Sequence, residues 1–320
     1  MMASHSADAP IVVIGGALAD VRAAPSRTAR GRTMRRGESV PGSVRVAAGG
    51  AARNVAANLA RFGRSVVLLT AVGDDALGRW ILDETEAAGV DTAHAVRLAH
   101  PTATFVTMIV DGDEPWCVSD AGVVEALTAE HVAAWAPMIS RAAVVVADAN
   151  MSESVHHAVR DAAVQSLRVL LTTSPSKAPR LRPVVHGAAI VVGSVAEGRA
   201  LLTVGDRDGA ESAYAVARRD PDWRRVGDAL TRAGVAQAIL TLGPRGIASV
   251  TADDHVHVDA LTEPVVDTLG AGDAVAAAVV HGAVACMPVR ETLALAARAA
   301  AHVARCTEVT PSSLHAVLAS

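Results

Sequence analysis

Short apolar runs that alternate with helical segments limit most strongly how this chain can fold. Strands are predicted at 11–16, 66–72, 143–147, 168–171, 188–192 and 236–241. Helices are predicted at 51–62, 76–88, 129–139, 154–165, 195–202, 226–233, 274–285, 289–305 and 311–318. Continuous apolar runs are typical of parallel strands that are covered on both faces. The pattern therefore predicts an α/β fold whose parallel sheet carries helices on both sides.

Several segments depart from this alternation. The runs 103–110 and 115–119 resemble two strands joined by the turn Asp111-Gly112-Asp113, and 44–46 alternates like a strand. Together they predict a small projecting sheet that could act as a lid. The strands 247–250 and 256–258 are predicted at an antiparallel edge, the basic stretch 22–41 as a mobile or edge element, and 205–223 as a surface excursion. We expect a single domain over 1–320, with lid strands from about 18–48 and 102–120.

The composition argues against several classes of protein. Of the 320 residues, 51% are hydrophobic, and the formal net charge of −4 argues against a nucleic-acid-binding protein. The polar N-terminus has no signal-peptide pattern, and the apolar run 274–285 is too short for a membrane span, so we expect a soluble cytoplasmic protein. Residues without metal-ligand spacing receive structural interpretations. The cysteines Cys117, Cys286 and Cys306 are predicted to be small buried hydrophobic residues. The histidines His156, His157, His255 and His257 are predicted at the surface or at sheet edges.

The heptad Asp267-Thr268-Leu269-Gly270-Ala271-Gly272-Asp273 carries the strongest chemical signal, just before the helix predicted at 274–285. Its glycines allow the backbone to approach a ligand closely, and the unpaired N–H groups at a helix start attract an anion. A carboxylate beside a phosphate would repel it, unless the carboxylate takes a proton from the attacking group. The economical interpretation is an anion hole with Asp273 as general base, the two parts that phosphoryl transfer needs. The alternative is a glycine-rich loop in which Asp273 only favours the helix start.

Two further glycine-containing turns are candidate ligand sites. Gly49-Gly50-Ala51-Ala52-Arg53-Asn54 is predicted where a strand passes into a helix, and Asn54 offers a donor and an acceptor that suit sugar hydroxyls. Thr241-Leu242-Gly243-Pro244-Arg245-Gly246 follows a predicted strand, and Arg245 could offset phosphate charge. Each segment could equally be an ordinary tight turn.

Two of these motifs resemble the signatures of the ribokinase-like (PfkB) carbohydrate kinase family, the first at Gly49 to Gly73 and the second at Asp267 to Val280. The resemblance implies a ribokinase-like three-layer α/β sandwich, with a mostly parallel central sheet and a small β-sheet lid. It implies that Asp273 is the catalytic base and that the backbone of Gly270, Ala271 and Gly272 forms the anion hole. The implied substrate-binding residues are Asp20, Gly49, Gly50, Arg53, Asn54 and Asn150. The implied ATP-site residues are Ser194, Glu197, Thr241, Gly243, Arg245 and Gly246, and Glu197 would also hold Mg²⁺ through water.

The resemblance further implies the use of ATP and Mg²⁺, leaves open a requirement for a monovalent cation such as K⁺, and implies a homodimer formed through the lid. Within the family, several short stretches are most similar to pseudouridine kinases. They are Val13 to Ala17, Pro41 to Arg45, Gly49 to Asn54, Ser119-Asp120, Asp148 to Asn150 and Ser176 to Ala178. The sequence departs from the family pattern twice. Leu18 stands where many relatives carry an Asn that helps to hold the sugar, and Ser194-Val195-Ala196-Glu197 replaces an Asn-x-x-Glu motif, a pattern that is also a helix capping box.

These features predict transfer of the ATP γ-phosphoryl group to the 5′-hydroxyl of a ribosyl compound, with pseudouridine as the first choice of substrate. A kinase for another sugar or nucleoside, such as ribose, adenosine or a keto-sugar, remains an alternative. Because of Leu18 and Ser194, a catalytically weak nucleoside- or sugar-binding protein is a second alternative.

Overall fold

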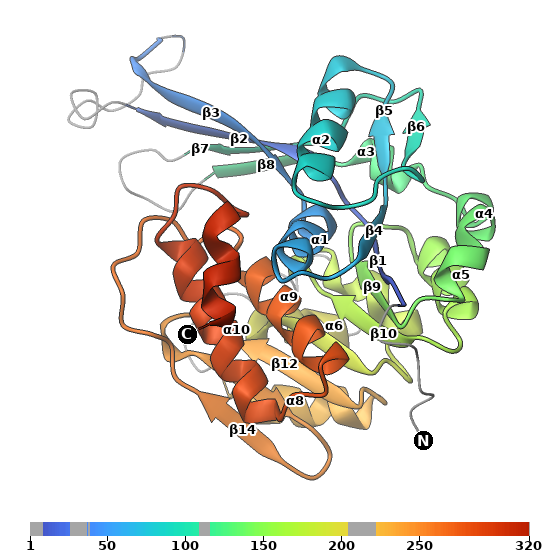
Figure 1. Ribbon diagram of the computed structural model, residues 1–320, viewed down its shortest axis with the longest axis vertical. Helices are drawn as coiled ribbons and strands as arrows, with labels where there is room; N and C mark the ends of the chain where they lie inside the picture. The colour runs from blue at the N-terminus through green and yellow to red at the C-terminus, as the bar shows by residue number, and fades with distance from the viewer. Residues whose placement is uncertain (1–8, 26–36, 38, 109–115, 204–221, 320) are drawn as a thin grey trace.

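The computed structural model of the chain describes residues 9–25, 37, 39–108, 116–203 and 222–319. Its larger sheet contains eight described strands in the order β14-β13-β12-β11-β10-β9-β1-β4 (Figure 1). Their bounds are β1 (Ile11–Ile14), β4 (Val66–Leu69), β9 (Val144–Asp148), β10 (Leu167–Leu171), β11 (Ile190–Ser194), β12 (Gln237–Thr241), β13 (Ile247–Val250) and β14 (His255–Val258). The six strands from β12 through β4 in this order pair in parallel, whereas β13 and β14 are antiparallel additions at the β12 edge. The predicted, mostly parallel sheet and its antiparallel edge are thus confirmed.

Helices cover both faces of this sheet. The α-helices are α1 (Ala51–Arg61), α2 (Ala76–Ala87), α3 (Gly122–Glu125), α4 (Ala129–Ile139), α5 (Glu153–Ala162), α6 (Val195–Leu202), α8 (Trp223–Arg232), α9 (Ala271–Val284) and α10 (Val289–Ala304). The 3-10 helices are η1 (Ala178–Val184), η2 (Gly243–Arg245) and η3 (Ser312–Leu318). Alternate residues of β1 enter two hydrophobic cores. Val12 and Ile14 belong to the core that also contains residues of α4, α5, α6 and α8, and Ile11 and Val13 to the core that contains residues of α1, α9 and α10. Burial on both faces explains why the strand reads as a continuous apolar run.

A second sheet projects from the body of the molecule, at the upper left of Figure 1. Its strands follow the order β3 (Gly42–Gly49), β2 (Leu18–Pro25), β7 (Thr104–Met108) and β8 (Trp116–Asp120). The structure confirms the predicted strands near 44–46, 103–110 and 115–119, while the turn at 111–113 lies outside the described residues. The prediction of a mobile or edge element was wrong for its first part, because β2 runs to Pro25 and pairs with β3 on one side and β7 on the other.

Three smaller expectations need correction. The predicted strand 66–72 divides at Thr70 into β4 and β5 (Ala71–Gly73), and β5 pairs with β6 (Val96–Leu98) outside the large sheet. The last predicted helix, 311–318, is the 3-10 helix η3. His156 is not at the surface, because it lies on the buried face of α5 with a side chain 1% exposed. Burial lowers the pKa of His156 to about 4, so the ring is neutral there. Most of 205–223 lies outside the described residues.

The predicted burial of the cysteines was also wrong. Cys117 and Cys286 are exposed and Cys306 is half-buried. Cys117 lies on β8, whose residues are all exposed. Cys286 follows the end of α9 with a φ of 53°, where the chain turns away from the core.

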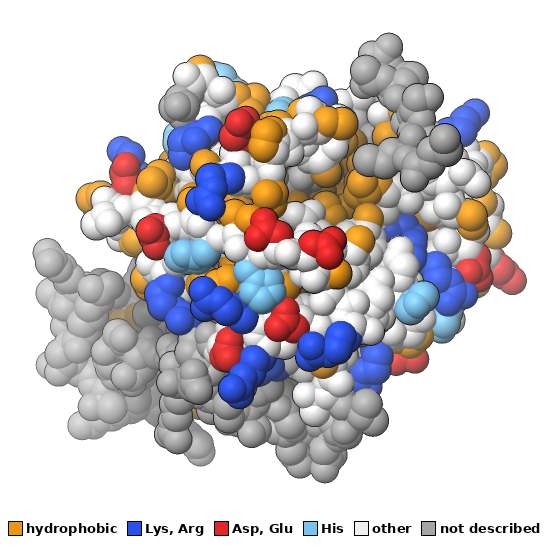
Figure 2. Space-filling model, turned by 90° about the horizontal axis from the view of Figure 1, so that it is seen from below, with side chains coloured by type: hydrophobic (Ala, Val, Ile, Leu, Met, Phe, Trp, Pro, Cys, Tyr) orange, Lys and Arg blue, Asp and Glu red, His pale blue; other side chains and the backbone are white. Residues whose placement is uncertain are grey.

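No helix within the described ranges combines the length and hydropathy that a membrane span needs. On the face seen in Figure 2, basic and acidic side chains are mixed with hydrophobic ones, and the described residues form no broad basic patch there.

Candidate active site

The tip of α9 is built as the heptad predicts. Gly270 is the N-cap residue and has a left-handed φ of 80°, a conformation that glycine adopts readily. A Cβ on Gly270 would lie 2.3 Å from the Cγ1 atom of Val309, so close packing also requires glycine. The helix begins at Ala271 and therefore presents unpaired N–H groups and the positive end of its dipole at Gly272 and Asp273. This arrangement favours an anion next to a carboxylate.

Asp273 is held by the helix that packs beside it. Asn54 Nδ2, in the first turns of α1, donates a hydrogen bond to Asp273 Oδ2 at 2.9 Å. Burial raises the pKa of Asp273 to about 7, and the Asn54 hydrogen bond opposes this rise. Three further carboxylates raise the pKa of Asp273 by repulsion: Asp20, Asp148 and Glu197. A carboxyl group whose pKa lies near neutrality is suited to general base catalysis.

The glycine pair before α1 makes room for Asp20. A Cβ on Gly49 would lie 1.9 Å from Asp20 Oδ2, so the position admits only glycine. Gly50 has a φ of 100°, and its Cβ would lie 2.4 Å from the carbonyl oxygen of Gly16. Asp20 is 6% exposed, and burial raises its pKa to about 6 against the opposing charges of Arg22 and Arg53. The structure thus brings Asp20, Gly49, Gly50 and Asn54 to one side of Asp273.

A buried aspartate to which the sequence assigned no role organises the neighbouring strand ends. Asp148, at the carboxyl end of β9, is fully buried, and its Oδ2 accepts hydrogen bonds from Gly16 N at 2.9 Å and Ala52 N at 3.1 Å. It also accepts from the backbone N and side-chain Nδ2 of Asn150, both at 2.9 Å. The predicted ligand Asn150 therefore lies at the same end of the sheet, held by Asp148. A polar residue directly after an apolar parallel strand is a signal that could have identified Asp148.

Arg53 donates to its neighbour Asn54 at 3.5 Å, but most of its contacts are with other elements. Its guanidinium donates to Thr85 Oγ1 at 3.2 Å in α2, to Thr310 Oγ1 at 3.0 Å and to the Ala48 carbonyl at 3.2 Å. The side chain therefore joins α1 to α2 and to the segment before η3. It also borders a cavity of about 690 Å³ that extends to Asp20.

A largely apolar cavity of about 520 Å³ lies on the other side of the α9 tip. Among the predicted ATP-site residues, Thr241, Gly243 and Gly246 line it, together with Ala271 and Gly272. Arg245 is exposed and is not part of the described wall of this cavity.

A smaller cavity of about 130 Å³ lies between the apolar cavity and Asp273. It shares Thr241 and Gly272 with the apolar cavity and is also lined by Ser194, Glu197 and Asp273. A nucleotide in the apolar cavity could therefore extend its phosphates toward Asp273.

Ser194 and Glu197 form the capping box of α6 and also border the small cavity. Glu197 Oε2 accepts from Ser194 N at 2.8 Å and from Thr172 Oγ1 at 2.7 Å, while Glu197 N donates to Ser194 Oγ at 3.3 Å. The predicted cap and the predicted ligand are compatible, because the side chain that caps the helix also lines the wall beside Asp273. No group of three or more His, Cys, Asp or Glu side chains within the described residues could hold a metal directly.

An ion pair that the motifs did not indicate joins the small sheet to the heptad. Arg22 of β2 donates to Asp267 Oδ2, and Asp267 Oδ1 accepts from Leu269 N at 2.9 Å. Arg22 is two residues after Asp20, so both side chains lie on the same face of β2. That alternation is the sequence signal that could have found Arg22.

The architecture is that of ribokinase-like proteins. The structure of Arabidopsis thaliana ribokinase complexed with ribose and ATP superimposes with a TM-score of 0.75 at 21% identity, covering 97% of this chain and 98% of that one. Thermotoga maritima ribokinase gives a TM-score of 0.79 at 16% identity, covering 98% of this chain and 100% of the other. These likenesses define the fold.

The family follows from the sequence match over nearly the whole chain. The model of pfkB family carbohydrate kinases matches residues 8–316, and the chain belongs to this family. Pseudouridine kinase of Escherichia coli is 26% identical over 290 residues, which cover 89% of this chain and 87% of that protein. The Escherichia coli protein described as uncharacterized sugar kinase YeiI is 37% identical over 116 residues, or 36% of this chain and 32% of its own length. The chain is therefore a phosphotransferase with a hydroxyl group as acceptor.

Proposed function

We propose that this kinase transfers the γ-phosphoryl group of ATP to the 5′-hydroxyl of a ribosyl compound, and that pseudouridine is this compound. The observation that carries the reaction is the position of Asp273. Its carboxylate is bonded to Asn54 on the sugar side and faces the cavity that leads to the apolar cavity on the nucleotide side. A group with a pKa of about 7 at that junction can accept a proton from an alcohol.

The chemistry follows from the residues around the α9 tip. The sugar is oriented by Asp20 and Asn54, so that its hydroxyl lies against the Asp273 carboxylate. As the oxygen attacks the terminal phosphorus, Asp273 takes the hydroxyl proton, the bond from that phosphorus to the β-phosphate oxygen breaks, and ADP leaves. The N–H groups at the start of α9 stabilise the negative charge on the transferring phosphoryl oxygens. The ATP base and ribose occupy the apolar cavity beside Gly243 and Gly246.

The residues present fit a magnesium ion that is held mainly through water. Mg²⁺ usually keeps several waters and needs only one or two carboxylates besides the substrate phosphates. Glu197 supplies one carboxylate beside the small cavity, and Thr172 fixes its orientation. When bound, the ion would neutralise phosphate charge. Its affinity for this site rests on Glu197, because Ser194 uses its backbone N–H and hydroxyl within the capping box.

Pseudouridine is proposed on the likeness to the Escherichia coli enzyme along most of both chains and on the short stretches quoted above. Leu18 supports the alternative of another sugar or nucleoside, because it is 8% exposed in β2 near Asp20 and cannot hydrogen-bond a hydroxyl.

A reaction that consumes ATP is expected in the cytoplasm. The small sheet would serve as the lid that excludes water from the site.

We further propose that the outer face of the lid pairs with a second copy of the chain. The strand register places four residues in one row across the sheet: Val46, Val21, Val106 and Val118. The neighbouring row consists of Val44, Ala23, Met108 and Trp116. Val118 is 68% exposed and Trp116 71% exposed. A continuous exposed apolar face of this kind is typical of a protein interface.

A panel of acceptors tests the function. Purified protein with MgATP would be given pseudouridine, uridine, adenosine, ribose and fructose, and product formation would be followed by mass spectrometry. The proposal predicts the highest kcat/KM for pseudouridine. A higher value for any other acceptor would overturn the substrate assignment. Calorimetric binding of nucleoside without turnover would favour a binding protein over an enzyme.

A further inference from the structure

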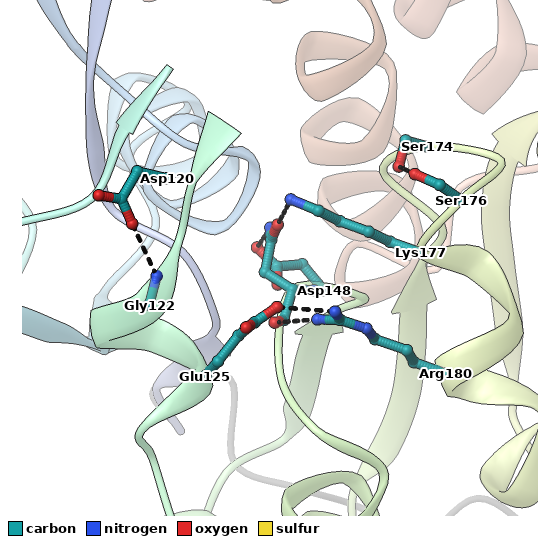
Figure 3. A network of polar contacts seen from close by, with 9 residues as sticks. Asp120, Gly122, Glu125, Asp148, Ser174, Ser176, Lys177 and Arg180 are labelled. Carbon is teal, nitrogen blue, oxygen red and sulfur yellow. Dashed lines mark hydrogen bonds and ion pairs between the residues drawn. The ribbon is translucent and has the colours of Figure 1, made fainter. Parts of the chain in front are cut away.

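Lys177 is the only lysine of the chain and lies next to the proposed sugar site. It stands in the loop between β10 and η1, and its Nζ donates to Asn150 Oδ1 at 2.6 Å. In Figure 3 its side chain extends over Asp148 toward the side of the molecule where Asp120 of β8 lies. The ammonium group is therefore held by Asn150 at the carboxyl end of the large sheet.

Lys177 has hydrogen-bond donors to spare, whereas its neighbour Asn150 has already used both ends of its amide. Both ends of the Asn150 amide are engaged, since Nδ2 donates to Asp148 and Oδ1 accepts from Lys177. A lysine ammonium carries three N–H donors. Within the described residues, the one hydrogen bond of this ammonium is to Asn150, so donors remain for a ligand. Asn150 thus serves to aim the lysine.

The charges around Lys177 indicate what kind of acceptor it would meet. Arg180 Nη2 pairs with Glu125 Oε1 at 2.7 Å, so these two charges offset each other. Burial lowers the pKa of Lys177, and the Asp148 carboxylate is the largest opposing influence. The charges of Lys177 and Arg180 are thus matched by those of Asp148 and Glu125 without a ligand. An uncharged acceptor, such as a carbonyl oxygen, suits a balanced cluster better than a carboxylate or a phosphate, because an added anion would leave unpaired negative charge.

The geometry also fixes which end of the substrate reaches Lys177. Asn54 holds Asp273, whereas Ala52, in the same turn of α1, bonds to Asp148. A sugar whose hydroxyl lies at Asp273 and whose ring crosses this turn directs its opposite end toward Asn150. We propose that Lys177 determines specificity by donating a hydrogen bond to a carbonyl oxygen of the nucleobase. This inference rests on the proposed function, because it assumes that the sugar carries a base.

A comparison of two acceptors tests the role of Lys177. One is pseudouridine, and the other is the same C-riboside with phenyl in place of uracil, which keeps the sugar but has no carbonyl. Lys177→Met keeps most of the stem and removes the donors. We expect its kcat/KM to fall about 10- to 100-fold for pseudouridine, the effect of losing a hydrogen bond from a charged group, and to stay within about twofold for the phenyl compound. Lys177→Arg should recover part of the preference, and Ser176→Ala should behave as wild type.

Each outcome decides the inference. An equal loss on both acceptors in Lys177→Met would show a structural role and overturn the proposal, as would an unchanged preference for pseudouridine. Turnover of the phenyl compound shows that the variant is folded. Failure of the proposed function would appear separately, as a wild-type protein that phosphorylates neither compound. Calorimetric binding of the same two acceptors would then still show whether Lys177 binds the carbonyl oxygens of the base.

Discussion

At the scale of single residues, opposing influences set the pKa of Asp273, and Asn54 supplies one of them. Burial and three neighbouring carboxylates favour the protonated form of Asp273, while the hydrogen bond from Asn54 favours the ionised form. The resulting pKa of about 7 means that the base is ionised above neutral pH. Asn54 would therefore have two tasks, which are to orient the sugar and to keep the base available.

This balance predicts a pH dependence. Wild-type kcat/KM should rise with pH through about 7, because only the ionised carboxylate accepts a proton. Asn54→Leu removes the stabilising donor, so the rising limb should move to higher pH. The control is Asn58→Leu, the same change one turn further along α1, where the side chain lacks a hydrogen-bond partner within the described residues. Its limb should stay in place. A limb that Asn54→Leu leaves unmoved, or moves to lower pH, would separate Asn54 from the ionisation.

Sequence motifs predict those site residues that lie in a recognisable local turn or helix start. The heptad placed Asp273 at a helix start, and the glycine pair placed Asn54 in the first turns of α1. Asp148, Lys177 and the Arg22–Asp267 pair received no role, because only contacts with distant parts of the chain reveal one. Asp148 bonds to Gly16, 132 residues away, and Arg22 to Asp267, 245 residues away. No local pattern contains such contacts.

At the scale of elements, the large sheet could be predicted because its strands are apolar on both faces. The strand β2 was expected only somewhere within the lid range 18–48, because its pattern is inverted. Asp20 and Arg22 point inward to the site, while Val21 lies in the outward apolar row. Sequence patterns normally assign the apolar face to the core. The departure has a functional reason, since one strand supplies a proposed sugar ligand, a tie to the heptad and part of an outer apolar surface.

The 3-10 helices were missed or misassigned for a different reason. The helix η1 contains Pro179 and Pro183, and the N-cap residue of η3 is Pro311. Proline removes a backbone donor and interrupts regular helix. In η3 the buried residues Leu314 and Val317 are three positions apart, a spacing that also fits an α-helix in the sequence.

At the scale of the whole molecule, the outer face of the lid predicts self-association. Wild-type protein should sediment as a dimer in analytical ultracentrifugation. Val46→Glu should give monomer, because the change places like charges in the apolar face of both copies. Val164→Glu is the matched control, since Val164 is 74% exposed after α5 and away from the small sheet. A monomeric wild type at all concentrations, or a dimer that survives Val46→Glu, would show that this face has another role.

The proposed mechanism depends on Asp273 as the base, and substitution of Asp273 should not unfold the protein. A carboxyl group whose pKa is raised on folding binds its proton more tightly in the native state, so its contribution to stability falls as pH rises from 3.8 toward about 7. Asparagine cannot ionise and avoids this loss. The Tm of Asp273→Asn at pH 8 should therefore equal or exceed that of wild type.

The most direct test is the single-turnover and steady-state kinetics of Asp273→Asn with MgATP and the best acceptor of the panel, together with calorimetric ATP binding. We predict that kcat falls at least about 10²-fold, the range for loss of a general base, while the Kd for ATP is nearly unchanged. Turnover close to that of wild type would contradict the assignment of Asp273 as the base and, with it, the mechanism proposed for the α9 tip.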